Sequence, residues 1–216
     1  MAYDKVFIFD LDGTLIDSKY QITECVNEAR QYFGFFSADP DELFSKIGLP
    51  VESLFADLEL SGSAMKEIVN YFRVKLSETI SINNKVFPGV LDFLSSAREL
   101  GIGIGVATSK PNDLAKKVVA NSALAELIDY VQGLDNFPGK PDPEVIIRVM
   151  HNLPSSSYFM FGDRIEDIEA AKSAKINGVG IAQGFHSEAD LSKAGAIKTY
   201  SSFAFIDSPR SILLLG

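Results

Sequence analysis

The sequence has no tryptophan, a single cysteine at Cys25, and no stretch of about 18 continuous apolar residues. A lone cysteine excludes an internal disulfide and suits a reducing compartment, so we expect a cytoplasmic protein. Without a long apolar run we expect no helix that spans a membrane. Asp4 and Lys5 precede only a short apolar run, so the N-terminal residues lack the pattern of a signal peptide.

Positive charge is also scarce, because 20 lysines and arginines stand against 29 acidic residues, for a net charge of −9. The acidic excess is spread along the chain and there is no basic stripe, so we expect neither nucleic acid nor an anionic membrane as a partner. An anionic substrate would need a local positive source, such as a metal ion, a lysine or a helix N-terminus. With 216 residues, of which 46% are hydrophobic, the chain can form one large globular domain or one domain that carries a smaller insert.

The most informative stretch lies near the start of the chain. Residues 5–9 (K-V-F-I-F) have the pattern of a short buried strand, and Asp10, Asp12 and Gly13 follow it directly. Two carboxylates so close together repel each other unless a cation lies between them, and a glycine lets a ligand approach the backbone. Because open α/β sheets bind ligands at the carboxyl ends of their strands, the stretch predicts a divalent metal and an anionic substrate at this edge.

The periodicity of the apolar residues divides the chain into two kinds of structure. Residues 18–85 contain helix-period segments at about 18–33, 40–47, 50–58 and 63–80 and no good strand, which predicts an all-helical insert of roughly seventy residues. From residue 86 onward helices alternate with strands, which are predicted at 102–107, 128–133, 157–161, 178–182 and 197–200. This alternation predicts a parallel α/β sheet with helices on both faces. We therefore expect a core of residues 1–15 and 86–216 and a helical domain of residues 16–85.

Further polar side chains follow other strands of the predicted sheet. Thr108 and Ser109 follow one strand, Asp163 follows another, and Lys140 lies on a loop between a strand and a helix. Asp167 is one helical turn beyond Asp163, so the two carboxylates share a helix face. Oxygen ligands of this kind suit Mg²⁺ rather than zinc, and no His/Cys cluster argues otherwise.

Four stretches carry a resemblance to a known family. D-L-D-G-T-L-I-D-S (10–18), A-T-S-K-P (107–111), K-P-D-P-E (140–144) and G-D-R-I-E-D-I-E-A-A-K-S-A (162–174) resemble, in order, the four motifs of the haloacid dehalogenase-like phosphatases, in their phosphoglycolate-phosphatase-like branch. The resemblance covers residues 1–15 and 86–196 and fades in the helical insert. It implies a Rossmann-like doubly wound core with a helical cap, hinged near 16–19 and 82–87.

The resemblance also implies catalytic roles. Asp10 would attack phosphorus and form an aspartyl-phosphate. Asp12 would protonate the leaving alcohol and later activate water. Thr108 would hydrogen-bond a phosphoryl oxygen, and Lys140 would stabilise the nucleophile and the phosphoryl charge.

A Mg²⁺ site is implied on the same edge. Asp10 and Asp163 would be its carboxylate ligands, and Asp12 would contribute its backbone carbonyl. Asp167 would hold the water shell of the metal or orient Lys140.

Substrate contacts are expected from Gly13 and Ser109 in the motifs, from Lys46 in the helical insert, and from Arg164. Lys46, with Gly48 and Leu49, lies on a loop that resembles the specificity loop of the family. Ser109 stands where relatives often have asparagine, and Arg164 stands where serine or threonine is commoner. Arg164 could pair with Glu166 or Asp167, or reach a substrate anion.

The sequence therefore predicts a phosphatase acting on a small phosphorylated metabolite, similar to phosphoglycolate. A nucleoside monophosphate or pyrophosphate phosphatase, a sugar phosphomutase, a phosphonate hydrolase using a cap lysine and a catalytically silent binding protein stay open. Both a monomer and a homodimer are compatible with the sequence.

Overall fold

The computed structural model describes residues 3–47, 49–79 and 85–215. Within these ranges six parallel strands form one sheet in the order β3-β2-β1-β4-β5-β6. The strands are β1 (Val6–Phe9), β2 (Gly103–Pro111), β3 (Tyr130–Leu134), β4 (Tyr158–Gly162), β5 (Asn177–Ile181) and β6 (Lys198–Tyr200). The predicted doubly wound α/β fold is thereby confirmed, with β1 at the centre between β2 and β4.

Helices cover both faces of the sheet because successive side chains of a strand point to opposite sides. Phe7 and Phe9 of β1 pack in one apolar cluster with α4 and α5, whereas Val6 and Ile8 pack in another with α6 and α7. The helices that follow the helical insert are α4 (Val90–Glu99), α5 (Asn112–Ala120), α6 (Glu144–Asn152), α7 (Ile165–Ser173), α8 (Glu188–Ala194), the 3₁₀ helix η2 (Phe203–Phe205) and α9 (Pro209–Leu213).

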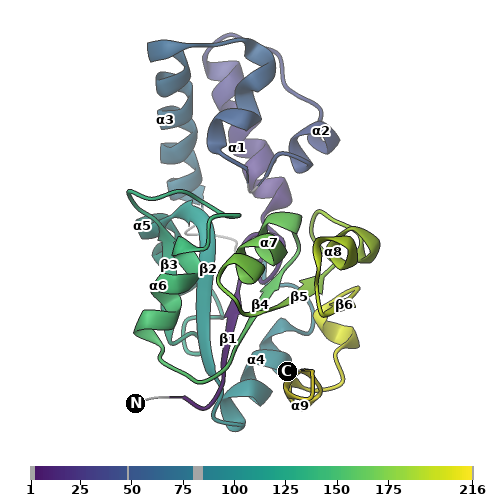
Figure 1. The fold of residues 1–216 in the computed structure, drawn as a ribbon. Coiled ribbons are helices and arrows are strands. Elements are labelled where there is room, and N and C mark those ends of the chain that lie inside the picture. The colour runs from purple at the N-terminus through teal and green to yellow at the C-terminus, as the bar shows by residue number, and fades with distance from the viewer. Residues whose placement is uncertain (1–2, 48, 80–84, 216) are drawn as a thin grey trace.

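The stretch between β1 and α4 is helical, as predicted. We call residues 19–79 the helical segment; it contains α1 (Lys19–Tyr32), α2 (Pro40–Phe44), η1 (Val51–Leu58) and α3 (Gly62–Thr79). Its helices bury their own apolar stripes, among them Ile22 and Val26 of α1 and Ile68, Phe72 and Leu76 of α3. Figure 1 shows this segment above the carboxyl ends of the strands.

Local chemistry explains where α2 begins. The Asp39 side chain accepts a hydrogen bond from the N–H of Asp41 at 2.8 Å and so caps α2, where Pro40 takes the first helical position. Residues 51–58 form a 3₁₀ helix rather than an α-helix. It ends at Glu59 in the left-handed conformation and is tied to α1 by a bidentate Arg30–Asp57 pair at 3.0 and 2.8 Å.

The two links between the helical segment and the sheet lie side by side. Ile16 forms an antiparallel bridge with Val86, the N–H of Asp17 donates to Lys85 at 2.8 Å, and the N–H of Phe87 donates to Leu15 at 3.0 Å. The first predicted hinge, 16–19, begins at this pair of links. Part of the second predicted hinge, residues 82–84, lies outside the described residues.

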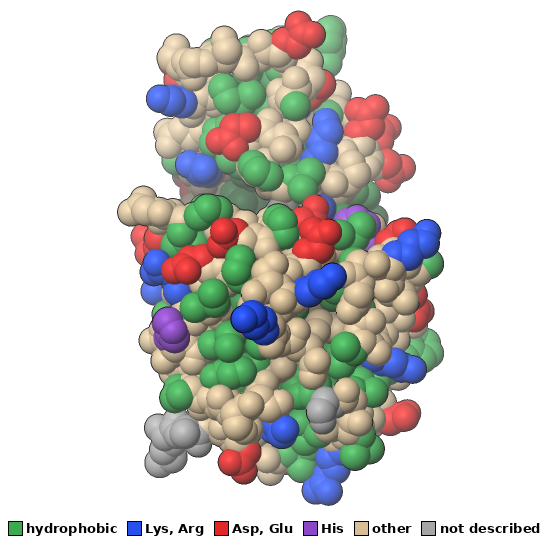
Figure 2. Space-filling model, in the orientation of Figure 1, with side chains coloured by type: hydrophobic (Ala, Val, Ile, Leu, Met, Phe, Trp, Pro, Cys, Tyr) green, Lys and Arg blue, Asp and Glu red, His purple; other side chains and the backbone are tan. Residues whose placement is uncertain are grey.

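The surface matches the expected charge pattern on the face seen in Figure 2, where lysines and arginines are scattered among acidic side chains. Figure 2 also shows a hollow at the waist between the helical segment and the sheet. Over the part of the chain that the structure describes, we find no helix with the length and apolar character of a membrane span.

Candidate active site

The loop after β1 holds Asp10 at the carboxyl edge of the sheet. The N–H of Asp10 continues the strand ladder by donating to Phe161 at 2.9 Å, and the residue is 6% exposed. Gly13 has φ +88°, and a Cβ there would lie 2.5 Å from Asp163 Oδ2. Only glycine combines this conformation with such close packing, so the turn brings the β1 and β4 carboxylates together.

Lys140 lies between two of the predicted carboxylates. Its Nζ is 2.6 Å from Asp10 Oδ1 and 2.5 Å from Asp167 Oδ1, and it also donates to the carbonyl of Ala107 at 3.0 Å. Burial alone would lower the pKa of the Lys140 ammonium, but the attraction of Asp10 and Asp167 outweighs it and raises the pKa above its ordinary value. Lys140 is therefore a fixed positive charge.

Asp163 is fully buried and both of its carboxylate oxygens accept hydrogen bonds. The hydroxyl of Thr14 donates to Oδ1 at 2.8 Å, and the N–H of Phe185 donates to Oδ2 at 3.0 Å. A Cβ on Gly184 would collide with the Asp163 carboxylate, so this glycine allows the loop after β5 to close over the site. No role was predicted for Gly184 from the sequence, although it begins the stretch G-F-H-S-E-A-D-L (184–191), which also resembles the family.

The site carries excess negative charge. Among the described residues, Asp10, Asp163 and Asp167 offer carboxylate oxygens that lie within 4.8 Å of one another. Burial raises the pKa of Asp10 to about 6, with Lys140 opposing and the charges of Asp167 and Asp12 adding to the rise. Burial, together with the charges of Asp167 and Asp10, also raises the pKa of Asp163.

A divalent cation fits this donor set. Lys140 pairs with Asp10 and Asp167, whereas Asp163 accepts hydrogen bonds from the neutral Thr14 hydroxyl and Phe185 N–H, so the repulsion among the three buried carboxylates is only partly compensated. Carboxylate oxygens are the ligands that hard divalent cations prefer. Asp10, Asp163 and Asp167 are therefore the residues that could hold a metal ion here.

The Asp12 carboxylate lies apart from this cluster and has its own partner. Asp12 Oδ2 is 2.9 Å from the Nζ of Lys110, whose side chain is 6% exposed. No role was predicted for Lys110 from the sequence, although it lies in the A-T-S-K-P stretch (107–111) that resembles a family motif.

A cavity of about 570 Å³ opens between the sheet edge and the helical segment. The sheet side brings together most of the predicted site residues: Asp10, Asp12, Thr108, Ser109, Lys140, Arg164 and Asp167. The wall contributed by the helical segment is largely apolar and includes Ile22, Ile47, Leu49, Leu54, Phe72 and Leu76.

Thr108 and Ser109 reach the cavity from an irregular part of β2. The register between β2 and β3 shifts between Ala107 and Pro111, so the strand continues beyond the predicted end at residue 107. A bulge of this kind bends a strand and redirects its side chains. Thr108 is buried and its hydroxyl accepts the N–H of Lys110 at 3.2 Å.

Arg164 joins the sheet side to the helical segment. Its Nη2 donates to the carbonyl of Ile47 and, at 3.3 Å, to that of Ser45. Its guanidinium lies 4.3 Å from the centre of the Phe185 ring, and its Nη1 is 3.9 Å from Glu166. The pairing with Glu166 is present, and a substrate contact of Arg164 stays a prediction.

The residues predicted in the helical segment are less clearly placed. Lys46 does not line the cavity, although Ile47 and Leu49 do, and Gly48 lies outside the described residues. A substrate contact of Lys46 therefore stays a prediction.

Lys19 makes a contact that was not predicted from the sequence: its Nζ donates to the carbonyl of Gly184 at 2.5 Å and lies 4.9 Å from the Phe185 ring centre.

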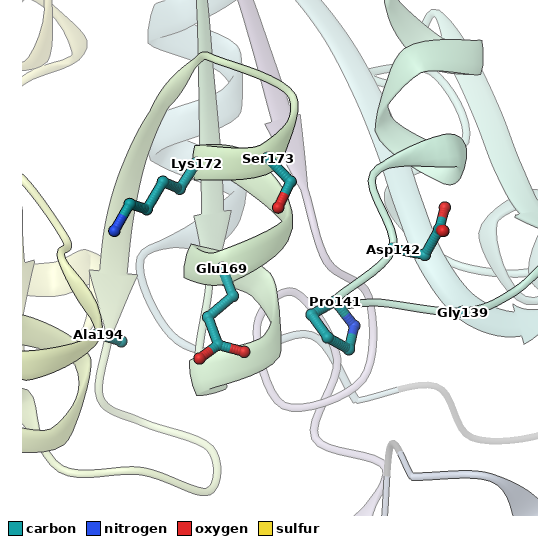
Figure 3. Close-up of a pocket in the computed structure, with 7 residues that line it drawn as sticks. All are labelled: Gly139, Pro141, Asp142, Glu169, Lys172, Ser173 and Ala194. Carbon is teal, nitrogen blue, oxygen red and sulfur yellow. The ribbon is translucent and has the colours of Figure 1, made fainter.

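A second depression lies beside α7 and is separate from the carboxylate cluster. Figure 3 shows Glu169, Lys172 and Ser173 on this helix, with the loop of Pro141 and Asp142 on one side and Lys172 extending toward the other side, where Ala194 lies. None of the three clustered carboxylates lines this depression. We therefore assign the chemistry to the cavity at the sheet edge.

Known proteins resemble this chain over most of its length. The haloacid dehalogenase-like hydrolase family matches residues 7–181. A phosphoglycolate phosphatase of Chromobacterium violaceum is 27% identical over 214 residues, which cover 94% of this chain and 95% of that protein. A 5'-nucleotidase of Pseudomonas aeruginosa is 30% identical over 188 residues, which cover 85% of each chain.

A solved structure agrees with the sequence relatives. The crystal structure of a predicted phosphatase from Clostridium acetobutylicum superposes with a TM-score of 0.84 at 29% identity, over 99% of this chain and 100% of that one. The resemblance read from the four motifs is thereby confirmed. The chain belongs to the haloacid dehalogenase-like hydrolases and is related to the phosphatases of that family.

Proposed function

We propose that this hydrolase is a Mg²⁺-dependent phosphatase that acts on a small phosphorylated metabolite through an aspartyl-phosphate on Asp10. The observation that carries the proposal is the position of the Asp10 carboxylate. It is buried at the sheet edge, opens onto the cavity, and is held by Lys140 beside Asp163 and Asp167. A carboxylate fixed in this way is pre-oriented as a nucleophile.

The residues around Asp10 have complementary roles in the proposed reaction. An Asp10 oxygen bonds to phosphorus as the bond from phosphorus to the leaving oxygen breaks, and Asp12 gives its proton to the departing alcohol. A water molecule then attacks phosphorus, Asp12 takes its proton, and phosphate leaves Asp10. Thr108, Ser109 and the N–H groups of Leu11 and Asp12 orient the phosphoryl oxygens, and Lys140 offsets their charge.

Asp10, Asp163 and the carbonyl of Asp12 would hold Mg²⁺, with Asp167 holding its water shell. When bound, the ion supplies neutralisation of phosphoryl charge. Burial, together with the charges of neighbouring aspartates, raises the pKa of Asp10 and the pKa of Asp163. A bound cation would favour the ionised form of both carboxylates, which supports this assignment.

We further propose that residues 16–85 act as a cap on a core of residues 1–15 and 86–216. The paired links at Ile16 and Val86 support this boundary, since both connections cross at one place. Arg164 and Lys19 each join the two parts close to the cavity. Closure of such a cap excludes water while the phosphoenzyme forms.

Phosphoglycolate is one candidate substrate, since phosphoglycolate phosphatases are among the relatives. Its second anionic group would need a cation without a partner. Lys110 and Lys140 lie in ion pairs and Arg164 donates to two carbonyl groups. Among the described residues that line the cavity, this leaves the exposed Arg73 of α3 as the candidate cation.

A nucleoside monophosphate is the second candidate, and the cavity itself favours it. A volume of about 570 Å³ with an apolar wall is larger than a two-carbon leaving group requires and can bury the faces of a base and a sugar. One relative is a 5'-nucleotidase.

Release of inorganic phosphate from a panel of phosphorylated metabolites tests the proposal. We expect turnover with Mg²⁺, loss of turnover with EDTA, and a preference for one of the two candidate classes. Arg73→Met should lower kcat/KM for phosphoglycolate if that is the substrate, whereas Lys66→Met, an exposed lysine of the same helix, should not. A wild-type protein that releases no phosphate from any member would refute a phosphatase, and an isomerised product without free phosphate would identify a phosphomutase.

A further inference from the structure

The two aspartates that follow β1 have separate lysine partners. Lys140 Nζ lies 2.6 Å from Asp10 Oδ1, and Lys110 Nζ lies 2.9 Å from Asp12 Oδ2. The Lys110 and Asp12 side chains are 6% and 12% exposed, so this second pair is also shielded from water. The sequence resemblance gave Lys140 a role but none to Lys110.

The backbone of Lys110 is held in place by its surroundings. It lies in the β2 irregularity between Ala107 and Pro111, and its N–H donates to the Thr108 hydroxyl at 3.2 Å. A Cβ on Gly133 of β3 would lie 2.5 Å from the Lys110 carbonyl oxygen, so the neighbouring strand packs directly against it. Lys110 is therefore a poor candidate for a flexible surface lysine.

Asp12, the partner of Lys110, is also separated from the other carboxylates of the site. Asp10, Asp163 and Asp167 form the cluster with oxygens within 4.8 Å, and among the described residues Asp12 is not part of it. A buried carboxylate without a partner is strongly disfavoured and is drawn toward the nearest cation. With Lys110 as its partner, Asp12 stays on the cavity side, where both residues are part of the lining.

We propose that Lys110 is a positioning residue for Asp12. It holds the Asp12 carboxylate away from the Asp10 cluster and directed at the position where the leaving oxygen departs. Lys110 neither gives nor receives a proton in this scheme. The inference rests on the proposed function, in which Asp12 protonates the leaving alcohol.

A comparison of two leaving groups separates this role from a general structural one. An alkoxide leaves slowly unless it is protonated, whereas 4-nitrophenolate is stable enough to leave unaided. Since kcat/KM reports the steps up to loss of the leaving group, Lys110→Met should lower kcat/KM for an alkyl phosphate, such as glycerol phosphate, by about 100-fold. The loss with 4-nitrophenyl phosphate should be at least about ten times smaller.

Matched variants sharpen the test. Lys117→Met, an exposed lysine on α5, should leave both values unchanged, and Lys110→Arg should recover part of the loss because it keeps the charge. Lys110→Gln is a second neutral variant should Lys110→Met fold poorly; folding is checked by thermal unfolding. In an Asp12→Asn background, Lys110→Met should cause little further loss with the alkyl phosphate, because both residues act through one group.

Equal losses with the two substrates, or losses that add in the double variant, would overturn the role of Lys110 while leaving the phosphatase intact. A wild-type protein that releases no phosphate from these esters or from any member of the metabolite panel would overturn the proposed function and this inference with it.

Discussion

The two walls of the cavity differ in their chemistry. The sheet edge carries buried charged side chains that are held by one another, as in the Asp10–Lys140–Asp167 group and the Asp12–Lys110 pair. The opposite wall, from the helical segment, is mainly aliphatic and aromatic and lies partly in the apolar core of α1 and α3. Charges held in place suit a reaction that is the same for every substrate, and an apolar wall suits selection among leaving groups by shape. We therefore expect the sheet edge to govern turnover and the helical wall to govern preference.

The largest effect should come from the sheet edge. Asp10→Asn removes the proposed nucleophile and should lower phosphate release by at least about 1,000-fold. The measurement is steady-state release of phosphate with Mg²⁺, with Asp41→Asn, an exposed residue of α2, as the control. Activity close to wild type in Asp10→Asn would rule out the covalent mechanism.

A substitution at a residue without a substrate contact should also lower activity, by displacing the carboxylates at the sheet edge. Gly184→Ala places a Cβ against the Asp163 carboxylate, so we expect a displaced cluster and a loss of activity of about 100-fold, since small misplacements in an active site are costly. Gly178→Ala in β5 is the control, because a Cβ there meets nothing closer than 3.3 Å. If both variants kept full activity, the tight packing around Asp163 would have no role in the reaction.

The buried carboxylates at the sheet edge should make the free energy of unfolding of the metal-free protein depend on pH. The pKa of Asp10 is raised from 3.8 to about 6, so the folded state retains a proton that the unfolded chain has already lost between these values. Stability contributed by this group is therefore highest below about pH 4 and falls, by up to about 3 kcal/mol, as the pH rises to about 6. The pKa of Asp163 is raised as well and acts in the same direction.

Urea unfolding in EDTA at several pH values measures this fall. Asp10→Asn should flatten it, and added Mg²⁺ should restore stability to the wild type near neutral pH, since a ligand that binds only the folded state stabilises it. A pH dependence that is the same in both proteins would contradict the assignment to Asp10.

The smallest effect is expected on the helical wall. Leu49 lines the cavity and is 36% exposed, so Leu49→Lys adds a cation there at little structural cost. The ratio of kcat/KM for phosphoglycolate to that for a nucleoside monophosphate should rise about two- to five-fold, as expected for one exposed ion pair. Leu91→Lys, at an exposed leucine of α4 that does not line the cavity, should leave the ratio unchanged.

Local sequence patterns predicted most of the fold. The apolar run before Asp10 indicated β1, and the Asp39-Pro40 signal indicated the start of α2, because both depend on neighbouring residues alone. Two details differed: residues 51–58 form a 3₁₀ helix, and β2 continues through Thr108 to Pro111. Both occur where the chain contacts other elements: Arg30 of α1 pairs with Asp57, and the ladder between β2 and β3 shifts its register.

The site was predicted to a similar extent. Asp10, Thr108, Lys140 and Asp163 follow strands or lie in motif stretches, and the structure brings them to one edge, although their roles stay predictions. No role was predicted for Lys110, Gly184 or Lys19, although Lys110 lies in the A-T-S-K-P stretch. Their importance comes from partners that are distant in the sequence, such as Asp12, 98 residues before Lys110, and Gly184, 165 residues after Lys19.

The sequence by itself determined the elements, the parallel sheet, and the set of carboxylates that follow its strands, because alternation, periodicity and motif spacing are properties of the linear chain. Only the tertiary structure decided which lysine faces which aspartate, which glycines the close packing requires, and that an apolar wall faces the charged edge. These features arise from the juxtaposition of strands and loops far apart in the chain, where distance and burial set the strength of each charge interaction.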